Sequence, residues 1–245
     1  MSLVAVNELR LLPREYGPIL PNEKEWLFRM SLSPATVESQ HQKFQRLGVD
    51  RITSSELLEV AYLSRRFTVD NSRKSPEEAV SVLSQFCAIL HRLLNLDPTS
   101  IPDNVDAHVA ESCRFAAALH VFNPLSGYYP DPTLMVATLI HRLKSAVSYL
   151  LFAAPTDGTN PRSEILLWLL SVGGIAAAKL PEHDWFVGHL YPIVADLGIE
   201  SWEQMREGLL RIPWYDNFCE VSFGKLWDEV SVKRESFGGG DIGSE

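Results

Sequence analysis

The sequence predicts an all-α protein, organised as a single multi-helix domain of antiparallel packed helices. Apolar residues recur at intervals of three and four along most of the 245 residues, which is the period of an amphipathic helix. Prolines and glycines divide these periodic segments into lengths typical of helices. Clusters of valine and isoleucine lack the alternation with polar residues that a half-buried strand requires.

The helical domain is predicted to span residues 35–234. Residues 1–34 contain four prolines and little periodicity, so we expect an extended segment there, with at most one short turn at residues 26–30. The end of the chain, FGGGDIGSE, is rich in glycine and has little to bury, which predicts disorder for residues 235–245.

Two helices are expected first in the domain. One starts at Ser54 or Ser55, whose hydroxyl is a good N-cap acceptor, and runs to about Phe67. The other starts at the SPEE of residues 75–78, where a capping serine precedes a proline in the first turn and two carboxylates near the positive helix end. Its apolar residues keep helical spacing until shortly before Pro98.

Two more helices follow. Asp103 or Asn104 caps the first, which we expect to stop before Pro124. Asp131 and Pro132 start the second, whose apolar residues recur at about every fourth position: Met135, Leu139, Leu143, Val147 and Leu150.

The next segment, EILLWLLSVGGIAAAK at residues 164–179, is apolar on every side of the helix that it forms. A helix of this kind is buried all round. Its fourteen uncharged residues, 165–178, fall short of the roughly 20 that a membrane span needs, and Pro161 and Pro181 bracket it. We therefore expect a core helix that starts at Pro161 to Ser163, and no membrane association.

Gly173 and Gly174 lie inside this helix, where each glycine costs about 1 kcal/mol relative to alanine. Three alanines follow at 176–178, so one surface carries almost no side chains. We expect the backbone of a neighbouring helix to approach closely there. A phosphate-binding loop is excluded, because SVGGI lacks the glycine spacing and the preceding strand of such loops.

Three helices complete the prediction, at residues 182–197, 201–211 and 215–233. Gly198 ends the first of them, and Pro213 follows the second.

The charge distribution argues against nucleic-acid binding. The net charge is −9, and residues 181–245 hold 13 acidic and 5 basic side chains. A basic face that could neutralise phosphates is missing. The densest basic segment, RRFTVDNSRK at residues 65–74, is interpreted as a solvated helix end and loop.

The sequence supports neither a metal site nor a catalytic constellation. Three distant cysteines contain no CxxC pair. The densest polar group is PEHDWFVGH at 181–189, where Glu182 and His189 share a helix side but His183 and Asp184 project elsewhere. His120 and His141 are interpreted as boundary residues of amphipathic helices, and no GxSxG elbow is present. We therefore predict no catalytic residue, no cofactor and no metal, and hence no enzyme.

Five tryptophans crowd into residues 168–227, which is typical of a packed core with some indoles at a cavity or interface. In order, LLWLLSVGGIAA, DWFVGHL and SWEQMREGLLRIPWYDNFCEVSFGKLWDEV resemble the regulatory domain of fungal zinc-cluster transcription factors. The resemblance covers residues 105–230 best and 36–100 loosely. The positions that match the family are Leu167, Trp168, Gly173, Gly174, Trp185, Phe186, Leu190, Trp202, Trp214, Cys219 and Trp227.

The resemblance implies an all-helical regulatory protein in the nucleus (otherwise cytoplasmic) that acts through protein partners, a second copy of itself among them, or through a small apolar effector. It does not carry over sequence-specific DNA binding, because the family's cluster of six cysteines and its basic linker are missing from these residues. Two alternatives stay open: a helical enzyme of secondary metabolism with a cavity between its helices, and a non-catalytic helical adaptor.

Overall fold

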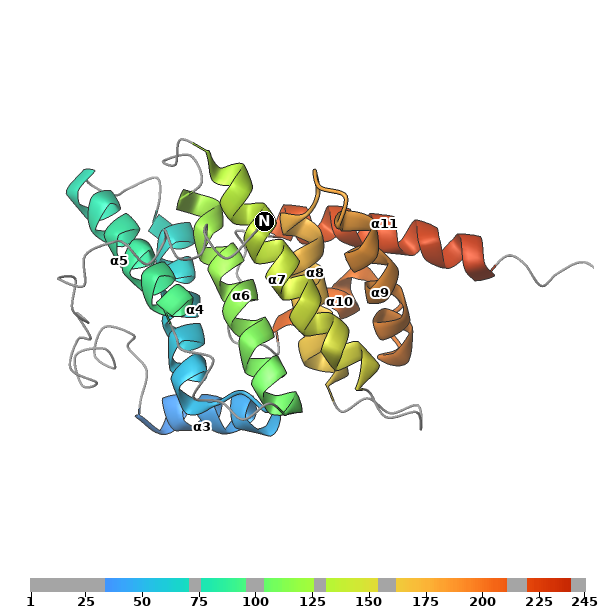
Figure 1. The fold of residues 1–245 in the computed structure, drawn as a ribbon, viewed down its shortest axis with the longest axis horizontal. Coiled ribbons are helices and arrows are strands. Elements are labelled where there is room, and N and C mark those ends of the chain that lie inside the picture. Colours follow the sequence, from blue (N-terminus) through green and yellow to red (C-terminus); the bar gives the residue numbers. More distant parts are fainter. Residues whose placement is uncertain are drawn as a thin grey trace, which may run out of the picture. The chain divides into compact units, whose positions relative to one another are not determined.

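The computed structural model describes residues 34–70, 76–95, 104–125, 131–153, 162–210 and 220–238, and all regular structure in them is helical. This confirms the predicted fold class. The turn expected at residues 26–30 lies outside the described residues. Figure 1 shows the helices: α3 (Pro34–Arg46), α4 (Arg51–Asp70), α5 (Pro76–Asn95), α6 (Val105–Leu125), α7 (Pro132–Phe152), α8 (Ser163–Ala176), α9 (His183–Asp196), α10 (Trp202–Leu210) and α11 (Glu220–Gly238).

Packing divides the chain into two units after Gln40, inside α3. The predicted domain boundary at residue 34 stays a prediction. Of the first unit, the structure describes only residues 34–40, which are helical. The second unit, His41–Glu245, contains all the features considered below.

The helix starts show which capping predictions hold. Oδ1 of Asp131 accepts from the N–H of Thr133 at 3.1 Å, with Pro132 in the first turn, as expected. Asn104 is the cap that α6 uses, since its Oδ1 accepts from the N–H of Ala107 at 2.9 Å.

The prediction for α4 was wrong at its start. Asp50 is the cap, because its Oδ1 accepts from the backbone N–H groups of residues 52 and 53 at 2.8 and 2.9 Å. Ser54 and Ser55 lie inside the first turns, where both hydroxyls donate to the carbonyl oxygen of Arg51. The carboxylate of Asp50, four residues before Ser54, therefore caps the helix in place of either serine.

The helix ends differ slightly from expectation. Helix α6 runs one residue past Pro124, to Leu125, and α9 is followed by Gly198 at a φ of +64°, as a glycine stop requires. Helix α11 reaches Gly238, which is five residues beyond its predicted end at residue 233. Residues 239–245, and the expected start of this helix at 215, lie outside the described residues.

Helices α6 and α8 are the two central helices of the second unit. Helix α6 packs against α4, α5, α7 and α8, whereas α8 packs against α6, α7, α9, α10 and α11. Figure 1 shows α4 and α5 on one side of α6, and α9, α10 and α11 beyond α8. The pairing of α6 with α7 is antiparallel, because His108 near the start of α6 stacks on Tyr149 near the end of α7, with ring centroids 3.8 Å apart.

The apolar segment of α8 is a buried core helix, as predicted. All residues from Ser163 to Gly174 except Glu164 are buried, and the Trp168 side chain is only 1 % exposed. Within the described residues, α7 is the one helix that is long and apolar enough to cross a membrane by length and composition alone, whereas α8 is too short. Helix α7 packs against α6 and α8 through one side, so this composition is weak evidence for a membrane.

The two glycines of α8 receive side chains from two different helices. A Cβ at Gly173 would lie 2.2 Å from Cε1 of Phe186 in α9, and a Cβ at Gly174 would lie 3.0 Å from Cδ1 of Leu226 in α11. The predicted approach of a helix backbone was therefore wrong, because side chains of the neighbouring helices fill the space. Phe186 is 0 % exposed, so its ring has no room to retreat.

Replacing Gly173→Ala is expected to destabilise the protein by about 1–3 kcal/mol, because the new methyl group overlaps a buried ring. The gain in helix propensity, about 1 kcal/mol, is too small to compensate. Chemical denaturation monitored by circular dichroism measures the difference.

The matched control for this prediction is Gly188→Ala in α9, where a Cβ would meet nothing within 4 Å. We expect it to be neutral or stabilising by up to about 1 kcal/mol. If Gly173→Ala and Gly188→Ala change the free energy of unfolding equally, the close contact between Gly173 and Phe186 is refuted.

Candidate effector pocket

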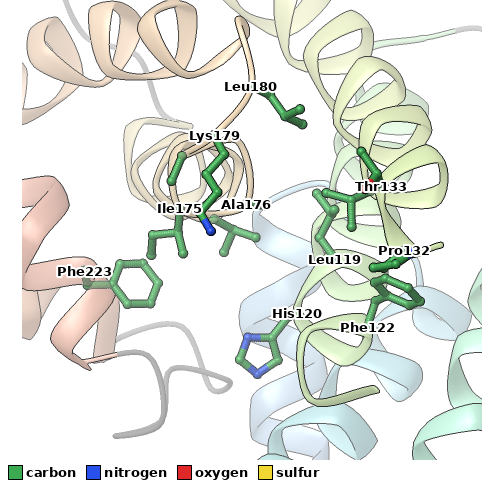
Figure 2. A pocket seen from close by; sticks show the side chains of 13 residues that line it. Leu119, His120, Phe122, Pro132, Thr133, Ile175, Ala176, Lys179, Leu180 and Phe223 are labelled. Atoms are coloured by element: carbon green, nitrogen blue, oxygen red, sulfur yellow. The ribbon is translucent and has the colours of Figure 1, made fainter. Parts of the chain in front are cut away.

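A cavity of about 360 Å³ lies between α6, α7, α8, α11 and the turn that follows α8 (Figure 2). Most of its walls are apolar. Its lining residues are Leu119, His120, Phe122, Pro132, Thr133, Val136, Val172, Ile175, Ala176, Ala178, Lys179, Leu180 and Phe223.

Small residues at the end of α8 leave this space open. Ala176 is the last residue of the helix, and Ala178 follows in the turn, so neither position reaches across to the opposite wall. Figure 2 shows Phe223 of α11 on one side of Ile175 and Ala176, and Leu119 and Phe122 of α6 on another side. The first turn of α7, which Pro132 and the Asp131 cap hold in place, supplies Thr133.

Three polar side chains line the otherwise apolar cavity: His120, Thr133 and Lys179. The ring of His120 is oriented by α4, because its Nε2 lies 2.9 Å from the Ser64 hydroxyl oxygen. Ser64 itself is buried and is not part of the cavity wall. Few polar groups on an apolar wall are typical of sites for small molecules, where they fix orientation.

The residues that match the family lie mainly outside this cavity. Trp168, Gly173, Gly174 and Phe186 form the packing around α8 described above. Trp202 and Trp227 are half-buried. Trp214 lies outside the described residues, as does Cys219. The prediction that these positions are structural is therefore compatible with the packing, and no pocket residue was among them.

Trp185 connects α9 to α7 at the protein surface. Its indole lies edge-on to Phe186, with ring centroids 5.0 Å apart, and is tilted over His189 at 4.3 Å. The ammonium of Lys144 lies 5.3 Å from the centroid of the same indole, in a cation–π contact.

The polar segment at 181–189 makes a hydrogen bond within α9. His189 Nδ1 hydrogen-bonds to the carbonyl oxygen of Trp185, 2.8 Å away. In the described part of the chain, no group of three or more His, Cys, Asp or Glu residues is arranged to hold a metal ion.

His183 links three helices. Its Nδ1 lies 2.9 Å from the carbonyl oxygen of Gly174 in α8, and its Nε2 lies 2.6 Å from Oε2 of Glu229 in α11. Both neighbours accept hydrogen bonds, so the ring makes both contacts fully only when both nitrogens carry protons. Partial burial lowers the pKa of His183, but the two hydrogen bonds and the charges of Glu229 and Asp184 outweigh it, and the pKa is raised above 6.5.

Two arginines connect neighbouring helices. Arg92 of α5 pairs with Glu56 and Glu59 of α4, while Nη1 of Arg114 donates to the carbonyl oxygen of Leu93 at 3.1 Å. Cys113 in α6 is fully buried, and burial strongly raises the pKa of its thiol, so it does not supply a thiolate.

Replacing His183→Gln is expected to cost about 1 kcal/mol at pH 6, and progressively less as the pH rises towards 8. The raised folded-state pKa makes the contribution of His183 fully present below the unfolded pKa of 6.5, and the contribution is lost as the pH rises through the folded pKa. Urea unfolding at several pH values measures it.

Exposed His141 of α7 supplies the control, His141→Gln. A stability difference for His183→Gln that stays constant between pH 6 and 8, or grows with pH, would contradict the protonated contact with Glu229.

Comparison of the chain with models of protein families, with curated proteins and with solved structures finds no match.

Proposed function

We propose that this chain is a non-catalytic, all-helical regulatory protein of the transcription-factor type. A small apolar molecule controls it by binding in the cavity described above, which we name the effector pocket. The single observation that supports the effector is the cavity of about 360 Å³ between α6, α7, α8 and α11. This volume lies at the lower end of the range of small-molecule sites, roughly 300–1,000 Å³.

A ligand in this pocket would couple helices that are distant in sequence. It would contact the end of α6, the start of α7, the end of α8 and Phe223 of α11. Each Å² of apolar surface that it buries contributes about 25 cal/mol. A ligand that fits one arrangement of these helices better than another shifts the population towards that arrangement. This is the proposed regulatory step.

The output of this regulation is proposed to pass through protein partners in the nucleus, a second copy of the chain among them. This part rests on the resemblance to zinc-cluster factors. Exposed apolar side chains on α7, which include Leu134 and Phe152, offer area for such a partner. The acidic charge and the missing cysteine cluster argue against direct reading of DNA by these residues.

The alternative of a helical enzyme is supported less well. The pair of Ser64 and His120 has the distance of a nucleophile and its base, 2.9 Å. However, Ser64 is buried and does not line the cavity, so its hydroxyl is not positioned to attack a bound molecule. The geometry favours an effector site over an active site.

Replacing Ala176→Phe is expected to fill the pocket from the end of α8 and abolish ligand binding. The neutral fluorescent probe N-phenyl-1-naphthylamine should bind the wild type saturably at micromolar concentration, and its emission should stay low with the variant. Thermal unfolding of both proteins establishes that the variant is folded.

Regulation itself is tested with the chain fused to an unrelated DNA-binding domain upstream of a reporter gene. The wild-type fusion should alter transcription, and the probe should change that level only when position 176 is alanine. If the probe binds saturably but does not change transcription of the reporter, the chain binds a small molecule and the proposed regulatory role is refuted.

A further inference from the structure

We infer that the effector pocket selects an amphipathic ligand, with an apolar body and a single carboxylate that pairs with Lys179. The inference rests on the proposed function and names the chemical class of its effector. Two observations carry it: the composition of the cavity wall and the position of the Lys179 side chain.

Among the described residues that line the cavity, Lys179 carries a positive charge, and none of them is an aspartate or glutamate. This is notable in a chain with a net charge of −9, whose carboxylates repel anions elsewhere. A charged ligand would therefore meet attraction in this cavity only if the ligand is an anion.

Lys179 is directed into the cavity by the turn after α8. Figure 2 shows its side chain running beside Ile175 and Ala176, with its nitrogen turned towards the space bounded by Phe223, His120 and Leu119. Within the described residues, no carboxylate lies in ion-pair range of this ammonium. The ammonium is therefore open to a partner from the ligand.

The rest of the pocket fits an apolar body. Leu119, Phe122, Val136, Val172 and Phe223 cover the walls with aliphatic and aromatic surface. Lys179 is exposed, so a ligand without an anion would bury the apolar surface and leave the ammonium to water. A carboxylate on the ligand replaces part of that water with a charge-assisted hydrogen bond, which is roughly twice as strong as a neutral one. One ammonium matches one negative charge.

The test uses three probes that share one apolar chain: decanoic acid, decan-1-ol and decylamine, each below its micelle concentration. Isothermal titration calorimetry at pH 7.5 measures their affinities for the wild type, for Lys179→Met and for Lys225→Met. Methionine keeps most of the lysine stem and removes the charge. Lys225 is the control, because it is exposed on α11 and does not line the cavity.

The wild type should bind decanoic acid about tenfold more tightly than decanol, which corresponds to about 1.4 kcal/mol, and decylamine most weakly. Lys179→Met should bind the acid and the alcohol equally, with the affinity for the alcohol unchanged. Lys225→Met should behave as the wild type.

Two results would overturn the inference while the proposed function stands: equal binding of acid and alcohol by the wild type, or a preference for the acid that survives in Lys179→Met. If none of the three probes binds the wild type, and N-phenyl-1-naphthylamine does not bind either, the effector pocket and the proposed function both fail.

Discussion

The close approach of Phe186 and Leu226 to two adjacent glycines of α8 is the contact on which the second half of the fold depends. A helix that packs against five others needs places where neighbours come near, and positions 173 and 174 provide two of them on different sides. The glycines cost about 1 kcal/mol each in helix propensity. Burial of the Phe186 ring, worth about 1.5–3 kcal/mol, offsets this cost.

The same contacts lie next to the pocket in sequence, since Val172 and Ile175 line it. Leu226 holds α11 against Gly174, and the hydrogen bonds of His183 to the end of α8 and to Glu229 fix the same region from α9. Helix α11 thereby presents Phe223 opposite the small residues that end α8. At the glycines, the side chains of Phe186 and Leu226 fill the space, whereas the alanines beyond them leave room unfilled. A ligand there would contact the end of α8, which packs against five other helices.

The sequence predicts the fold well where local chemistry decides it. Apolar residues all around 165–174 allow only a buried helix, and Asp131 before Pro132 makes a cap that needs no tertiary support. The start of α4 was missed because Asp50, Ser54 and Ser55 are all competent caps, and propensity does not separate them. The ring that fills the space at Gly173 was not predictable, since helix packing brings Phe186 there. The pocket could not be predicted from the sequence for a related reason. Most of its lining residues are apolar residues of the types found in any core, and a single lysine after an apolar helix is typical of a solvated helix end.

Hydrogen exchange of the backbone amides, measured with and without N-phenyl-1-naphthylamine, tests most directly whether α8 is the central helix and its end the ligand site. Amides of residues 166–174 should exchange slowest in the free protein, through global unfolding only. The ligand should slow exchange at residues 132–136 and 175–180, which border the cavity, and leave α10 unchanged. Rapid exchange within 166–174, or ligand protection confined to helices away from the cavity, would contradict the account.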